Sequence, residues 1–266
     1  MRARRPMRSP KLIRRKREER LRRILLSVVF IVLTVAGGLY AFTLPAFIIE
    51  NIEIRGTALS TAEIAGFLRQ QLSGEYLGII PRGSIIFYPQ DKLEDSLLSR
   101  FPELQSARIG LAHMTSLSVA LADRQPSALW CVEERCFFMD AGGLLYRETM
   151  IDSGGLYRRF RPLATTSTSA VGMNVISPAS LTAFLSLASR LELMRLEVKE
   201  IVLDFDTATI VLAGGSRLLF RNDGDFAPDV ARLETVLAEN DLVPRNDGGL
   251  LVDYIDLRYG NKIYFR

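Results

Sequence analysis

The stretch that determines the architecture lies at residues 24–44 and reads ILLSVVFIVLTVAGGLYAFTL. It contains 21 residues, and none of them is charged. At about 1.5 Å of rise per helical residue, this stretch covers about 30 Å, the thickness of the hydrocarbon core of a bilayer. Only a helix satisfies its own backbone groups in lipid without closing into a barrel. Residues 24–44 are therefore predicted to form one transmembrane helix.

The charge distribution orients this helix. Of the 34 basic and 30 acidic residues, twelve and two lie in residues 1–23, which leaves 22 basic and 28 acidic residues for the remainder. Lys/Arg-rich flanks stay in the cytoplasm, where they also attract anionic membrane lipid. Residues 1–23 are therefore expected to be a basic cytoplasmic tail, with everything after Pro45 outside. The sequence pI of about 9.2 belongs to the tail, so we expect no nucleic-acid partner.

The features of residues 24–44 disfavour two other interpretations. A cleaved signal peptide would have an apolar core of about 7–15 residues and an A-x-A-like cleavage site. This stretch is longer, and no convincing site follows it. A buried core helix is disfavoured because twelve cations precede a stretch without charge.

The chain after the helix predicts alternating strands and helices. An apolar β-type run at residues 47–55 precedes a capping box, Ser60 to Glu63, and an apolar stripe that indicates a helix. A second amphipathic helix is predicted after Pro89, followed by strands at 107–112 and 117–123. The order is β-α-α-β-β, so the fold class is expected to be α+β.

The second half predicts a mixed β domain with two helices. Ser177 and Pro178 form an N-cap followed by Pro at the first helical position. The predicted elements are a hairpin at 128–131 and 136–140, a strand edge and polar loop at 156–168, helices ending near 193 and at 227–239, and strands at 197–204, 207–213, 216–221, 249–259 and 262–266.

Five motifs resemble the FtsQ/DivIB family of cell-division proteins. They are residues 52–56 (IEIRG), 59–64 (LSTAEI), 101–107 (FPELQSA), 117–130 (LSVALADRQPSALW) and, most closely, 254–259 (YIDLRY). The resemblance implies a POTRA domain at 47–125 and a β domain at 126–266. It also implies a single-pass scaffold of the bacterial divisome in the inner membrane, with the C-terminal part periplasmic, that recruits other proteins at the division septum.

The resemblance also implies partners and contact residues. The small bitopic proteins FtsB and FtsL would bind the last strands, and other divisome proteins would bind the POTRA domain. By position, the contact residues would be Tyr254, Asp256, Arg258, Tyr259, Asn261 and Ile263. Strict alternation along 254–259 puts Ile255, Leu257 and Tyr259 on one face of the strand and Asp256 and Arg258 on the other. A last strand that binds nothing is the alternative.

The sequence contains few groups suited to catalysis. The one histidine, His113, falls in a predicted turn, and the chain has no catalytic or nucleotide-binding motif of the common types. We therefore expect no enzyme activity, cofactor or metal. Cys131 and Cys136, the two cysteines, are expected to form a disulfide across a hairpin or to remain inert thiols. A membrane-anchored POTRA protein of secretion or envelope assembly is the alternative function, and an extracytoplasmic enzyme is a third.

Overall fold

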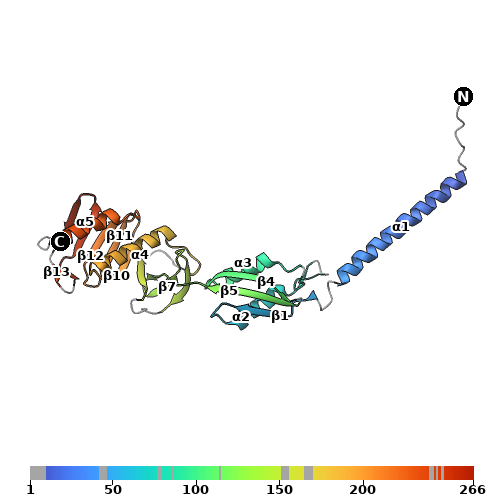
Figure 1. Ribbon diagram of the computed structural model, residues 1–266, viewed down its shortest axis with the longest axis horizontal. Coiled ribbons are helices and arrows are strands. Elements are labelled where there is room, and N and C mark those ends of the chain that lie inside the picture. The colour runs from blue at the N-terminus through green and yellow to red at the C-terminus, as the bar shows by residue number, and fades with distance from the viewer. Residues whose placement is uncertain are drawn as a thin grey trace, which may run out of the picture. The chain divides into compact units, whose positions relative to one another are not determined.

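The computed structural model describes residues 10–41, 47–76, 80–85, 87–113, 115–150, 156–164, 170–239, 243, 245–246 and 249–266. Its α+β class agrees with the prediction. The chain divides into two compact units, residues 1–97 with 107–121 and residues 98–106 with 122–266 (Figure 1). This division falls close to the predicted domain boundary after residue 125, which stays a prediction.

The first helix, α1 (Pro10–Ala41), continues from the basic tail into the apolar stretch. Its segment Glu19–Gly38 is long and apolar enough to cross a membrane, and no part of that segment is buried. The exposed apolar side chains do not fit a core helix, and they are compatible with a single-pass membrane anchor. Residues 1–9 of the predicted tail and 42–44 of the predicted span lie outside the described residues.

A three-stranded sheet with two helices follows α1. The strands lie in the order β1-β5-β4, with β1 parallel to β5. The Ser60 hydroxyl accepts a hydrogen bond from the Glu63 amide at 3.4 Å and caps α2. The elements are β1 (Asn51–Arg55), α2 (Thr61–Leu72), β2 (Glu75–Tyr76), β3 (Ile80–Pro81), α3 (Gln90–Arg100), β4 (Leu104–His113) and β5 (Ser116–Asp123). The short pair β2–β3 was not predicted.

A nine-stranded mixed sheet forms the second half, in the order β16-β15-β12-β11-β10-β9-β6-β7-β8. Its strands are β6 (Ala128–Val132), β7 (Arg135–Met139), β8 (Leu145–Thr149), β9 (Arg158–Pro162), β10 (Val198–Leu203), β11 (Thr207–Leu212), β12 (Arg217–Arg221), β15 (Tyr254–Tyr259) and β16 (Lys262–Phe265). A separate pair, β13 (Arg245–Asn246) and β14 (Gly249–Leu250), precedes β15.

Two helices, α4 (Pro178–Leu193) and α5 (Ala227–Ala238), pack on this sheet and enclose its core (Figure 1). Directly opposed residues of five neighbouring strands lie in this core, and each is fully buried: Phe160, Ile201, Ile210, Leu218 and Ile255. The Ser177 hydroxyl caps α4 by accepting from the Ser180 amide at 3.1 Å. Because the helices cover one face, the opposite face carries the remaining side chains of each strand.

Two strand predictions need correction. β9 was expected as a strand edge, but it pairs with β6 on one side and β10 on the other, both in parallel. The polar loop predicted after it falls partly on residues 165–169, outside the described residues. The single strand predicted over residues 249–259 is two strands, β14 and β15, because Leu251–Asp253 leave the extended ladder.

Candidate protein-binding edge

The predicted contact residues gather at the end of the nine-stranded sheet. β15 pairs in parallel with β12 and in antiparallel with β16, so its backbone is hydrogen-bonded on both sides. Within the described residues β16 has a neighbour on one side only. The backbone of Tyr254, Asp256 and Arg258 is therefore not open to a partner, and the strand with a free side is β16.

The register of β16 shows which of its backbone groups face away from β15. The Arg266 amide donates to the Tyr254 carbonyl at 3.3 Å, and the Tyr254 amide donates to the Arg266 carbonyl at 3.4 Å. Antiparallel ladders alternate between residues that exchange such bonds and residues that do not. The N–H and C=O groups of Phe265 and Ile263 therefore point outward, where a further strand could pair with them.

A β-bulge changes the side-chain pattern of β15. Asp256 pairs with Tyr264, but Tyr259 pairs with Lys262, so one extra residue of β15 lies between the two pairs. Tyr259 thus joins Asp256 and Tyr264 on the face away from the helices. This corrects the strict alternation predicted for Tyr259, which had placed it with Ile255 and Leu257.

Asp256 and Arg258 neutralise each other within the sheet. The guanidinium of Arg258 donates to both carboxylate oxygens of Asp256, at 2.9 and 2.7 Å, and to the Thr207 hydroxyl at 3.1 Å. Burial raises the pKa of Asp256, but these hydrogen bonds outweigh it and hold the pKa below its usual value. The hydrogen bond to Asp256 likewise raises the pKa of Arg258. Asp256 is only 6% exposed, so it organises the site rather than offering a free charge.

Exposed aromatic side chains lie beside this pair. Tyr259 packs edge-on against Tyr264 with ring centroids 5.5 Å apart, and the Arg258 guanidinium lies 5.5 Å from the centre of the Tyr259 ring. Tyr259 and Tyr264 are 56% and 48% exposed on this face, and Phe265, which lies on the other face of β16 opposite Ile255, is 44% exposed. Large aromatic residues that remain this exposed are typical of protein-binding surfaces.

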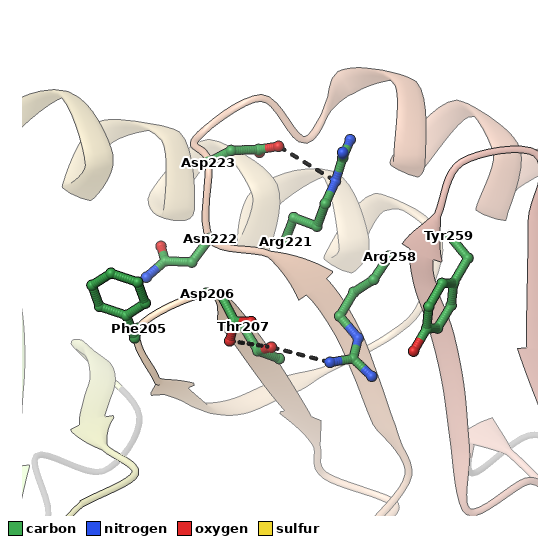
Figure 2. Close-up of a pocket in the computed structure, with 8 residues that line it drawn as sticks. All are labelled: Phe205, Asp206, Thr207, Arg221, Asn222, Asp223, Arg258 and Tyr259. Carbon is green, nitrogen blue, oxygen red and sulfur yellow. Dashed lines mark hydrogen bonds and ion pairs between the residues drawn. The ribbon is translucent and has the colours of Figure 1, made fainter.

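An open pocket of about 500 Å³ adjoins these residues (Figure 2). Its walls are the β10–β11 turn, the end of β12 and the end of β15. The lining residues are Phe205, Asp206, Thr207, Arg221, Asn222, Asp223, Arg258 and Tyr259. Arg221 and Asp223 form an ion pair at 3.5 Å on one side, and Arg258 reaches Thr207 on the other.

Phe205 is one of the site residues that sequence reasoning missed. The Phe205 amide donates to the Asp204 carboxylate at 2.8 Å, and the Asn222 side chain donates to the Asp204 carbonyl at 2.9 Å. These bonds fix the turn with the Phe205 ring 97% exposed at the pocket (Figure 2). An aromatic residue between two turn aspartates was the available signal, because a hairpin turn gives it no core to enter.

The other predicted residues lie in or next to β16. Asn261 is exposed in the two-residue turn that joins β15 to β16, after Gly260, whose φ of 55° suits such turns. Ile263 is partly buried and packs against the core. Cys131 and Cys136, on facing positions of β6 and β7, are joined by a disulfide at a distance along the sheet from this edge.

Among the described residues, no group of three or more His, Cys, Asp or Glu side chains could hold a metal ion. No known protein-family model matches the chain, and no curated protein sequence matches it.

Proposed function

We propose that this chain is a bitopic membrane scaffold of the bacterial divisome that links other cell-division proteins during septum formation. In this proposal α1 anchors the chain in the inner membrane with the basic tail in the cytoplasm. The residues after α1 lie in the periplasm, where the POTRA-like and β-rich parts bind partner proteins. Small bitopic proteins of the FtsB and FtsL type would bind β16.

The observation that carries the proposal is the open side of β16. Two residues, Ile263 and Phe265, have outward backbone groups with no hydrogen-bond partner among the residues that the structure describes, and exposed aromatic rings flank them. An added strand gains main-chain hydrogen bonds there, and side chains next to the strand select its sequence. Phe205 and the adjoining pocket offer an apolar anchor point close to the end of the same edge.

Two further features support the periplasmic placement. The apolar span in α1 follows a strongly basic segment. The Cys131–Cys136 disulfide is typical of oxidising compartments and unusual in the cytosol.

Of the other edge strands, β4 is less open. β4 ends the three-stranded sheet, and there the Glu94 carboxylate accepts a hydrogen bond from the Ile109 amide at 2.7 Å. A side chain that satisfies an edge amide reduces pairing with foreign strands. Among the described residues, β16 has no comparable side-chain cover.

A proline substitution tests strand capture without disturbing the native ladder. Phe265→Pro removes an amide that points away from β15, and proline is tolerated at such edge positions. We expect Phe265→Pro to abolish recovery of a small bitopic division protein in a pull-down and to remove a fluorescent fusion from mid-cell. Equal recovery by Phe265→Pro and the native chain would contradict the proposal.

Phe265→Ala is the matched control. It removes the same ring and keeps the amide, so a loss specific to proline reports on the backbone hydrogen bond rather than on the side chain. Thermal unfolding of both variants checks that the sheet stays intact.

A further inference from the structure

The face of β16 that points away from the helices carries positive charge at both ends. Lys262, Tyr264 and Arg266 share this face because alternate residues of a strand point the same way, and all three are exposed. Among the described residues, neither Lys262 nor Arg266 forms an ion pair. Arg258, the cation that the motif points to, is already neutralised by Asp256 at 2.7 Å. The unneutralised charges that would meet a captured strand are therefore those of β16 itself.

These charges disfavour pairing between two copies of the chain. A second copy that used the outward groups of both Ile263 and Phe265 would place Ile263 opposite its partner's Phe265, in antiparallel orientation. The same register places Tyr264 opposite Tyr264, and Lys262 opposite Arg266 at both ends. Like charges that lie directly opposite each other across strands are destabilising.

We propose that β16 selects a partner strand bearing carboxylates opposite Lys262 and Arg266, and that the same two cations keep β16 from pairing with itself. This inference rests on the proposed strand capture and adds its chemistry. The partner segment is acidic at two positions four residues apart on one face, with an uncharged residue between them that packs on Tyr264. Glu or Asp at those positions forms two cross-strand ion pairs where a second copy would meet two repulsions.

Single charge reversal gives a test that requires no partner. Lys262→Glu converts both repulsive contacts of the self-pair into attractive ones, because the introduced glutamate faces Arg266 of the second copy. Since two repulsive cross-strand pairs become two attractive ones, we expect self-association of the full chain in detergent to tighten by about tenfold. Sedimentation equilibrium in density-matched buffer measures it.

The matched control is Lys262→Glu combined with Arg266→Glu. It again opposes like charges at both ends, so it should self-associate as weakly as the native chain. If the single and double variants associate equally, the proposed register and its charge logic are wrong.

Strand peptides test the partner chemistry directly. The acidic probe is Glu-Val-Thr-Val-Glu between Gly-Ser flanks with a fluorophore, and the basic probe replaces both Glu by Lys. Fluorescence anisotropy at low salt should show at least about tenfold tighter binding of the acidic probe to the native full chain. The preference should reverse in the double variant.

The outcomes separate the two proposals. Equal binding of both probes that is lost in Phe265→Pro supports strand capture and overturns the charge selection. Binding of neither probe, together with a partner pull-down that Phe265→Pro leaves unchanged, overturns strand capture and the charge selection with it.

Discussion

At the scale of single residues, the Asp256 carboxylate holds the Arg258 side chain in place on β15, next to the edge strand β16. Its carboxylate accepts two side-chain hydrogen bonds from Arg258 and a further one from the Arg258 amide at 3.1 Å. The side chains of Asp256 and Arg258 are 8% and 29% exposed. A charged pair this sheltered stabilises mainly because removing one member leaves the other without a partner.

Asp256→Asn should lower the free energy of unfolding by about 1–3 kcal/mol at pH 7, since Arg258 keeps its charge but loses a charged acceptor. The folded pKa of Asp256 lies below its unfolded value of about 3.9. Its contribution is therefore present above that pH and is lost as the pH falls through the folded pKa. The stability gap between native chain and variant should shrink below about pH 4 in urea titrations.

Asp253→Asn is the control for this prediction, because Asp253 is exposed three residues before Asp256. An equal loss of stability in both variants would show that the Asp256–Arg258 pair contributes nothing specific.

At the scale of elements, the disulfide ties β6 to β7 at the closed end of their hairpin. Cys131 pairs with Cys136 in the strand register, and Cys131 is 4% exposed. A loop this short restricts the unfolded chain modestly, which the chain-entropy relation puts at about 2 kcal/mol. The disulfide thus supports the end of the sheet opposite to the β16 edge.

Replacing both cysteines by alanine should lower the free energy of unfolding by about 2 kcal/mol and leave partner capture unchanged. Dithiothreitol should lower the melting temperature of the native chain toward that of the variant and leave the variant unaffected. A native melting temperature that does not respond to full reduction would contradict this assignment.

Local signals account for how far the elements could be predicted. Capping residues Ser60 and Ser177 and the apolar stripes that follow them are local, and they marked the starts of α2 and α4 well. The position of β9 inside the sheet depends on pairing with β6 and β10, which strand periodicity does not encode.

In the candidate site too, local features could be predicted from the sequence, whereas features that depend on strand pairing could not. The motif at 254–259 coincides with β15, which is paired on both sides, and the bulge that reorients Tyr259 arises from pairing with β16, which strict alternation does not predict. The partnership of Asp256 with Arg258, two residues apart on one face, could have been anticipated from their spacing. The open backbone of Ile263 and Phe265 could not, because it depends on strand order.

At the scale of the whole molecule, the charge asymmetry around α1 predicts the topology. Ser9→Cys places a thiol in the basic tail, and Ser186→Cys places one on the exposed face of α4. In spheroplasts, a membrane-impermeant maleimide should label the Ser186 variant and not the Ser9 variant, because Lys/Arg-rich flanks remain in the cytoplasm.

Detergent lysis provides the control, since it should expose both thiols to the reagent. Labelling of the Ser9 variant in intact spheroplasts would show that the tail crosses the membrane, and the orientation would then be reversed.

The two-residue link Gly260-Asn261 has a consequence for how this surface could diversify. Strand side chains alternate with a period of two, so inserting one residue into the link would exchange the two faces of β16. Ile263 and Phe265 would then face solvent, and the lysine and arginine would be driven toward apolar neighbours. The insertion of a single codon would thus erase the recognition pattern without altering any residue of β16 itself.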